Sequence, residues 1–520
     1  MKKTKLFSIV LALVMVVSAV FVLVACNNGP AIDDTALKEI VAEGQKMTFD
    51  QLKEKAKQET GSFVAYGNTS RITTAMDNFI KAYGEELGIS KNEASKLDDS
   101  NIYTKLTNEE KAADKSKNAS VVLIQDSASL MNYRSTTSML TNYVPMGMED
   151  KVDSDNLLPL AHQFINKLFM YNTAGETNCK FTNVWQLTEA KYNKKIFFKS
   201  PTLEQVNMNF LIMLTNDEWS GKLEAAYKTW SGGKTADDVG NGKLYKNYGY
   251  KWIAEFLNNC NFSITSDTTI AQKLSTVDNK DKMGLFVLSK LRDNSVYGDN
   301  LAVSAWDEDA NKNLVKIEPF AGFMYAIYAQ LATNGPRPYT AMLFVNYLMT
   351  EDGFTPWKSL GGYSANNDVP IYSGNLSAPK TTDLAQAIPE ASGETVKYVY
   401  ADNNGREMVL TNIDKHKINE SDEKATTFKT YTYIDNNGAL TADTITDKQA
   451  DGSKTKVNVD GKDKDFEAKI VKGASAGSVQ DKPLSFWREN LVIEDGAYVL
   501  SVKIDVEDWI NRVITSGTGK

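Results

Sequence analysis

Cysteine and histidine are scarce in this chain of 520 residues, which contains three Cys and two His. Three cysteines cannot build the disulfide framework of a small secreted domain. The two histidines, His162 and His416, are far apart and lack the spacing of a zinc site. The sequence also has no His-Glu-x-x-His and no Gly-x-Ser-x-Gly motif. We therefore expect no metal site, no cofactor and no enzymatic activity.

An excess of positive charge is also absent, because 58 Lys and Arg residues stand against 66 Asp and Glu residues, for a net charge of −8. This balance argues against nucleic acid as a partner. The hydrophobic content of 42% is ordinary for a globular protein. Since the length exceeds what one hydrophobic core usually supports, we expect two lobes or more.

The one long apolar run lies at the N-terminus, from Leu6 to Val24, behind three lysines. A basic start, an apolar core and small residues before a cleavage site are typical of a secretory signal. The run ends in Leu-Val-Ala-Cys, which resembles the lipobox of bacterial lipoproteins, and the resemblance makes Cys26 the lipidated first residue of the mature chain. A transmembrane helix is the alternative, but the polar residues 27–30 favour the lipoprotein signal. We expect a signal peptide over 1–25 and a tether with leading helices over 26–59.

A strand, a polar loop and an amphipathic helix then occur in that order twice, with strands expected over 61–66 and 119–125. In open α/β sheets, ligands bind beyond the carboxyl ends of the strands, where helix N-termini present free N–H groups. The polar residues at these positions are Asn68, Thr69, Ser70 and Arg71 in the first loop and Asp126, Ser127 and Ser129 in the second.

These loop residues are candidate ligand contacts, and each type offers a different interaction. Arg71 could pair bidentately with a carboxylate or phosphate, and Asp126 could accept a hydrogen bond from an amine or a sugar hydroxyl. Local roles are the alternative: Thr69 or Ser70 as a helix cap, Asp126 as a turn residue, and Arg71 as a solvated charge.

Residues 393–480 are polar and contain no long apolar run. The stretch 398–405 recurs as 431–438, each placing Asn-Gly between strand-like residues, and a third candidate turn lies at Asp460-Gly461. Such turns are typical of β-hairpins. A calcium loop would need a series of oxygen ligands that ends in Glu, and neither copy has it. We therefore expect a β-rich hairpin insertion.

Several stretches together resemble bacterial ABC-transporter solute-binding lipoproteins of the extracellular solute-binding family 1 type. They are the lipobox, residues 63–84, VVLIQDSASL at 121–130, LFMYNT at 168–173, EPFAGFMYAIY at 318–328, and residues 341–357 followed by Gly361-Gly362-Tyr363-Ser364. The resemblance covers roughly 60–392 and 483–514 and leaves the hairpin insertion outside.

The resemblance implies an α/β, two-lobed periplasmic-binding-protein-like (type II) fold, whose solute lies in a cleft between the lobes and is enclosed by hinge closure. Lobe one would hold residues 60–168 and 326–520, including the insertion, and lobe two residues 173–317. The chain would cross between lobes at 169–172 and 318–325, with Tyr325 at the floor of the cleft.

It also implies a monomer on the extracellular face of the cell membrane, held by its lipid, that delivers a small polar solute to an ABC permease. Carbohydrates, polyamines and small anions all stay open. Iron-binding relatives typically use adjacent tyrosines, and since Tyr325 and Tyr328 are three apart and no Tyr-Tyr pair occurs, ferric iron is disfavoured.

Two other functions stay open. One is a surface-anchored glycan hydrolase that uses a carboxylate pair, and the other is an adhesive lipoprotein in which the hairpin insertion has the main role. Cys179 and Cys260 could pair outside the cell, although two cysteines define no framework.

Overall fold

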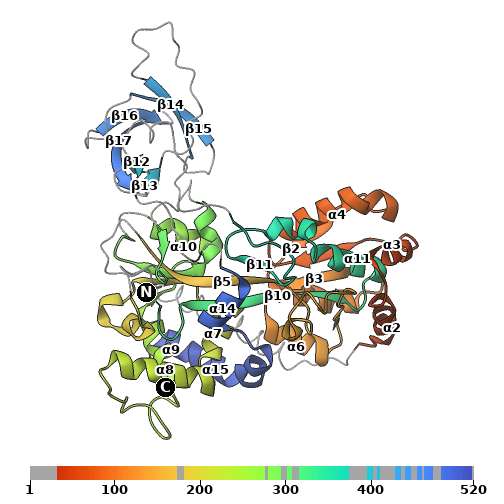
Figure 1. The fold of residues 1–520 in the computed structure, drawn as a ribbon, viewed down its shortest axis with the longest axis horizontal. Coiled ribbons are helices and arrows are strands. Elements are labelled where there is room, and N and C mark those ends of the chain that lie inside the picture. The colour runs from red at the N-terminus through yellow and green to blue at the C-terminus, as the bar shows by residue number, and fades with distance from the viewer. Residues whose placement is uncertain are drawn as a thin grey trace, which may run out of the picture. The chain divides into compact units, whose positions relative to one another are not determined.

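The computed structural model describes residues 32–172, 181–275, 279–293, 301–306, 316–373, 395–401, 407–409, 428–434, 440–446, 454–459, 462–471, 479 and 482–517. The ribbon in Figure 1 shows its helices and strands. The chain divides into two compact units. Unit 1 comprises residues 1–162, 327–356 and 365–369, and unit 2 comprises residues 163–326, 357–364 and 370–520.

Unit 1 is built on three parallel strands and one antiparallel strand. β1 (Val64–Gly67) lies between β2 (Glu93–Lys96) and β3 (Ala119–Ile124) and is parallel to both. β10 (Gly322–Ala332) runs antiparallel to β3, and the short β4 (Leu140–Thr141) pairs with the end of β10. β3 is apolar except for Ser120 and is buried along its whole length, as expected for a strand that is covered on both faces.

Helices cover the two faces of this sheet. On one face, α5 (Asp99–Lys111) and α6 (Ser127–Ser135) share a hydrophobic core with β1 and β3. On the other face, α4 (Arg71–Leu87) meets α11 (Pro338–Leu348), where the rings of Phe79 and Phe344 lie 5.0 Å apart. The short α12 (Glu351–Phe354) follows α11.

Two leading helices, α2 (Thr35–Gly44) and α3 (Phe49–Ala56), pack on α11. α3 begins with the capping box that Thr48 and Gln51 predict. Thr48 Oγ1 accepts from the Gln51 N–H at 3.3 Å, and Gln51 Oε1 accepts from the Thr48 N–H at 2.9 Å.

Unit 2 has the same strand plan as unit 1. β6 (Ile196–Phe198) lies between β7 (Cys260–Asn261) and β8 (Met283–Val287) and is parallel to both. β5 (Ala161–Asn172) runs antiparallel to β8, as β10 does to β3. In each unit, therefore, the first parallel strand lies between the next two, and a long antiparallel strand pairs with the third. The expected α/β fold with two lobes is confirmed in this form.

Shorter strands complete the sheet of unit 2. β9 (Leu301–Val303) and β11 (Gly362–Ser364) pair with β5, and β18 (Val492–Ile493) pairs with the first part of β10. The helices of unit 2 are α7 (Gln205–Met213), α8 (Asp217–Trp230), α9 (Tyr248–Asn259), α10 (Asp267–Leu274), α14 (Leu484–Asn490) and α15 (Gly496–Ser516).

The hairpins expected in the insertion are present. β12 (Thr395–Ala401) pairs antiparallel with β13 (Glu407–Val409), and β14 (Phe428–Ile434) pairs with β15 (Leu440–Thr446). β16 (Lys454–Val459) and β17 (Lys462–Val471) pair with Val459 opposite Lys462. The three turns expected from the sequence, at 402–405, 435–438 and 460–461, lie outside the described residues.

The compact units divide the chain differently from the lobes expected from the sequence. The expected lobe one included residues 326–520, whereas residues 370–520 cluster with unit 2. The cause is the C-terminal helix, since α15 packs on α7 and α9, and Tyr498 shares a hydrogen bond of 2.8 Å with Thr215. The unit boundaries fall after His162 in β5 and after Ala326 in β10, near the expected crossings.

Several expected features fall outside the described residues, among them the lipobox with Cys26, and Cys179. Cys260 is buried and forms no disulfide with any residue in the described ranges. None of the described helices is both long enough and apolar enough to cross a bilayer.

Candidate functional site

The loop after β1 leaves polar groups unused. β1 ends at Gly67 and α4 begins at Arg71, with Ser70 already in a helical conformation (φ −61°, ψ −10°). In that conformation the Ser70 hydroxyl caps no N–H group of the helix. Asn68 Nδ2 is buried and has no hydrogen-bond partner. The hydroxyl of Ser70 and the amide of Asn68 are therefore available to a ligand.

The loop after β3 is different, because its side chains bond one another. Asp126 caps α6: its carboxylate accepts from the Ser129 N–H at 3.2 Å and from Ser129 Oγ at 2.5 Å. Asp126 and Ser127 are buried, at 4% and 2% exposure. The local alternative considered for Asp126 was a turn residue, and the structure makes it a helix cap, which limits the carboxylate's capacity for a solute.

A second buried carboxylate, that of Asp99, accepts hydrogen bonds from the backbone of this loop. Its two oxygens accept from the N–H groups of Gln125 at 3.4 Å and Asp126 at 3.2 Å. Burial, reinforced by the negative charge of Asp126, raises the pKa of Asp99 well above its usual value. Sequence reasoning missed Asp99, although an acidic residue in the first turn of α5 is a recognisable signal.

The strand register brings the two loops to one edge of the unit 1 sheet. β1 and β3 are adjacent and parallel, with Gly67 opposite Leu123, so Asn68 and Asp126 follow the ends of neighbouring strands. β10 adds Tyr328, which lies opposite Ile124, the last residue of β3. Tyr328 is thus a candidate that the sequence analysis did not select.

The other two predicted site residues are Tyr325 and Arg71. Tyr325 is buried in the part of β10 that belongs to unit 2, where its ring lies 6.1 Å from that of Phe323. Arg71 is the first residue of α4 and is half-buried. The structure thus brings Asn68, Thr69 and Ser70 to one edge with the Asp126 loop, and assigns Tyr325 to the other unit.

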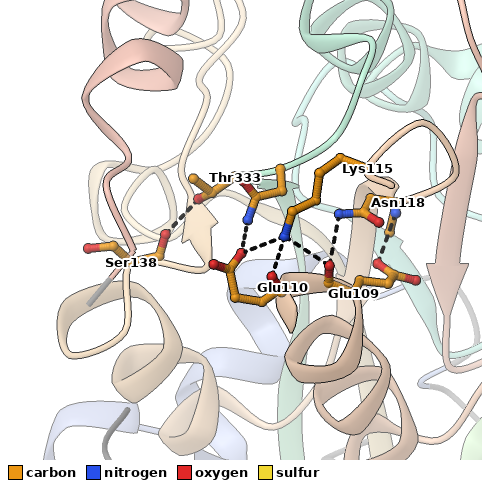
Figure 2. Close-up of polar contacts among 8 residues, drawn as sticks. Glu109, Glu110, Lys115, Asn118, Ser138 and Thr333 are labelled. Carbon is orange, nitrogen blue, oxygen red and sulfur yellow. Dashed lines mark hydrogen bonds and ion pairs between the residues drawn. The ribbon is translucent and has the colours of Figure 1, made fainter. Parts of the chain in front are cut away.

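The opposite edge of the unit 1 sheet is densely bonded, as Figure 2 shows. Lys115 Nζ donates to the carbonyl oxygens of Glu109 and Glu110, and the Glu109 carboxylate accepts from the Ala119 N–H at 3.0 Å. Asn334 donates to the Glu110 carboxylate, and Thr333 Oγ1 donates to the Ser138 carbonyl at 2.6 Å. These bonds join the end of α5 to the start of β3 and to the residues after β10.

In unit 2 a buried ion cluster joins β5 to residues that follow β6 and β7 in the chain. Lys167 on β5 is fully buried, and its Nζ donates to Glu204 and Asn207 at 2.9 Å each and lies 3.4 Å from Asp267. Burial alone would lower the pKa of Lys167, but the carboxylates of Asp267 and Glu204 outweigh it and raise that pKa. The ammonium is therefore charged, and its partners come from residues of this chain.

No group of three or more His, Cys, Asp or Glu side chains within the described ranges is arranged to hold a metal ion. His162 is fully buried, and desolvation lowers its pKa to about 3, so the imidazole is neutral at pH 7. Burial also raises the pKa of the Cys260 thiol. These two groups fit structural roles in the core.

Neither a protein-family model nor a curated protein sequence matches this chain. Solved structures that it is similar to include a ferric binding protein from Campylobacter jejuni, at 12% identity and a TM-score of 0.43, with 60% of this chain and 89% of that chain covered. Iron-bound HitA from Pseudomonas aeruginosa is similar at 13% identity, a TM-score of 0.41, and 61% and 90% coverage.

A structure described as an ABC transporter from Clostridium perfringens is similar at 10% identity and a TM-score of 0.37, with 60% of this chain and 88% of that chain covered. At these identities the likeness is one of folding pattern, and we carry over no residue role and no ligand from it.

Proposed function

We propose that this chain is a solute-binding receptor of an ABC importer, which captures a small polar solute and delivers it to a membrane permease. Two features of the chain support the proposal. The strand plan is repeated in two units, as the sequence resemblance implies, and polar groups gather at the carboxyl ends of the parallel strands in unit 1. Ligands of open α/β sheets bind at such strand ends.

The observation that carries the proposal is the loop after β1. Asn68 Nδ2 is buried without a partner, and the Ser70 hydroxyl is not used as a helix cap. A site for a small polar solute needs a few fixed polar groups with buried surroundings. In the proposed receptor, Asn68, Thr69 and Ser70 contact the solute, and Arg71 and the loop of Asp126, Ser127 and Ser129 border it. Tyr325, which belongs to unit 2, stays a separate candidate contact.

A lipid on Cys26 would hold the receptor at the extracellular face of the cell membrane, next to its permease. This part of the proposal rests on the lipobox-like residues 23–26. Expression of the full precursor in a bacterial host tests it by intact-mass measurement and by membrane fractionation. Cys26→Ser should abolish the added lipid mass and release the protein from the membrane fraction. An unmodified Cys26 in the parent would contradict the anchor.

The receptor itself is tested by purifying the mature chain without a tag, in native buffer, and identifying any co-purified compound by mass spectrometry. That compound should shift the thermal unfolding of ligand-stripped protein saturably, with one-to-one stoichiometry by calorimetry. It should be recovered unchanged after long incubation. Release of a product would instead favour the glycan hydrolase. If no compound co-purifies and none in a panel of sugars, polyamines and small anions binds, the receptor proposal is wrong.

A further inference from the structure

Two amide side chains at the start of the unit 2 part of β5 are buried without hydrogen bonds. Gln163 and Asn166 are each 0% exposed. Among the residues that the structure describes, neither the nitrogen nor the oxygen of either amide has a hydrogen-bond partner. Asn172, which is also 0% exposed on the same strand, differs, because its Nδ2 donates to the Leu274 carbonyl at 2.7 Å. Burial on β5 therefore does not by itself prevent an amide from finding a partner.

Two consecutive glycines cover these amides. β11 pairs with β5 so that Gly362 lies opposite Ile165. A Cβ atom on Gly361, whose φ is +70°, would lie 2.7 Å from Asn166 Oδ1, and one on Gly362 would lie 3.0 Å from Gln163 Nε2. Any larger residue would collide with an amide. The cover is thus bare backbone that supplies the amides with no hydrogen bond.

Such an arrangement opposes folding, since a buried polar group without a partner keeps the cost of losing its water. Both amides could be relieved only by a hydrogen-bonding group that enters between them and the glycines. The nearest buried charge on the strand is Lys167, and it is engaged by Glu204, Asn207 and Asp267. The groups left to bind a ligand are therefore two neutral amides, each with a donor and an acceptor.

We propose that Gln163 and Asn166 form a binding site for the hydroxyl or amide groups of a neutral solute, which enters when Gly361 and Gly362 move off β5. The inference rests on the proposed receptor function and names its solute class. Gln163 is the first residue of unit 2 after the chain leaves unit 1. A contact at this point places solute binding on the strand that connects the two units.

The test uses the full mature chain, stripped of ligand, with Asn166→Leu and Gln163→Met, which keep the size of the side chains and remove the polar atoms. Without solute, each variant should raise Tm by about 2 °C, because an unpaired polar group is lost. The matched control Asn172→Leu should lower Tm, because it breaks a buried hydrogen bond.

Maltose, N-acetylglucosamine and myo-inositol are the neutral probes, and spermidine and citrate are the charged ones. A neutral probe that binds the parent chain should bind each of the two variants at least tenfold more weakly, and bind Asn172→Leu with unchanged Kd. Equal Kd values for the parent and the two variants would overturn this inference and leave the receptor function standing. So would a lower Tm in both variants, the result expected if the amides only hold ordered water.

If the parent chain binds only the charged probes, the proposal of a neutral solute is wrong. If the parent chain binds no probe and carries no co-purified compound, both the inference and the receptor function fail.

Discussion

Near the amino ends of the unit 1 strands, the Glu109 carboxylate is hydrogen-bonded within the protein, whereas in the loop after β1, at the carboxyl ends, two polar groups are not. Glu109 accepts from the Tyr66 hydroxyl at 2.5 Å and from the Ala119 N–H at 3.0 Å. Beyond the other end of β1, Asn68 Nδ2 lacks a partner and Ser70 caps nothing. We call these the bonded edge, at Glu109, and the unbonded edge, at the loop after β1, although single groups depart from the contrast: Ser120 Oγ has no partner among the described residues, and Asp126 is bonded.

The difference separates stability from binding. A group that is bonded within the protein contributes to the free energy of unfolding, and its loss leaves a partner unsatisfied. A group without a partner does not stabilise the fold and is available for a ligand. Variants at the two edges should therefore change different quantities, and four predictions test that separation.

The largest effect is expected at the bonded edge. Glu109→Leu leaves the Tyr66 hydroxyl and the Ala119 N–H without their acceptor, so the free energy of unfolding should fall by about 3 kcal/mol. Urea unfolding followed by circular dichroism measures it. Glu85→Leu, at an exposed position of α4, is the control and should change the value by less than about 0.5 kcal/mol. Equal effects of the two variants would show that the hydrogen bonds of Glu109 do not stabilise the fold.

The second prediction concerns pH, through Asp99. Its raised pKa means that the folded state holds this proton more tightly than the unfolded chain. Stability is therefore gained below the raised pKa and lost as pH rises through it. Asp99→Asn should remove that dependence, whereas its stability at any one pH also reflects the loss of one of the two acceptor oxygens.

Unfolding curves between pH 4 and pH 8 check this prediction. Asp98→Asn should weaken that dependence only slightly, because Asp98 is exposed and its charge raises the pKa of Asp99 less than burial and Asp126 do. Parallel pH profiles for the parent and Asp99→Asn would show that the buried carboxylate is not the titrating group.

The third prediction concerns the unbonded edge. Asn68→Ala should weaken solute binding about tenfold, while the free energy of unfolding stays within about 0.5 kcal/mol of the parent. Asn92→Ala should do the reverse, because Asn92 Nδ2 already donates to the Thr73 carbonyl at 2.8 Å and to Asp77 at 2.6 Å. Calorimetry with the co-purified solute and urea unfolding measure the two quantities. If Asn68→Ala loses stability but keeps its affinity for the solute, then Asn68 supports the fold and does not bind the solute.

The smallest effect is expected at Ser70. Removing a serine that caps a helix usually costs about 1 kcal/mol. Since the Ser70 hydroxyl caps nothing, Ser70→Ala should cost less than about 0.5 kcal/mol. Asp126→Ala, which removes a bonded cap, should cost about 1–2 kcal/mol. A cost at Ser70 as large as that at Asp126 would show that the hydroxyl is engaged.

Local patterns predicted local structure well. Thr48 and Gln51 form the capping box that their spacing predicts, and β16 and β17 are paired, as the expected turn at 460–461 requires. Both depend on residues a few positions apart, where the choice of side chain fixes the backbone. The strand that ends at Gly67 was also expected, because its apolar residues run up to a polar loop.

Long-range features were not predictable in the same way. Asp99, 27 residues before Asp126, becomes relevant only because strand order puts it under that loop. The packing of α15 on α7 depends on a match of surfaces almost three hundred residues apart, such as Thr215 with Tyr498. The unpaired amides of Gln163 and Asn166 are visible only when every possible partner has a position.

The course of the chain between its units limits how the molecule can be cut. The chain passes from one unit to the other at 162/163, 326/327, 356/357, 364/365 and 369/370. No single truncation therefore yields a whole unit. Unit 1 could be isolated only as an engineered chain that joins residue 162 directly to residue 327. That chain would also need a linker in place of residues 357–364, which belong to unit 2. A protease that cuts one crossing divides the chain into two fragments, which should stay together through the packing within the units that they share.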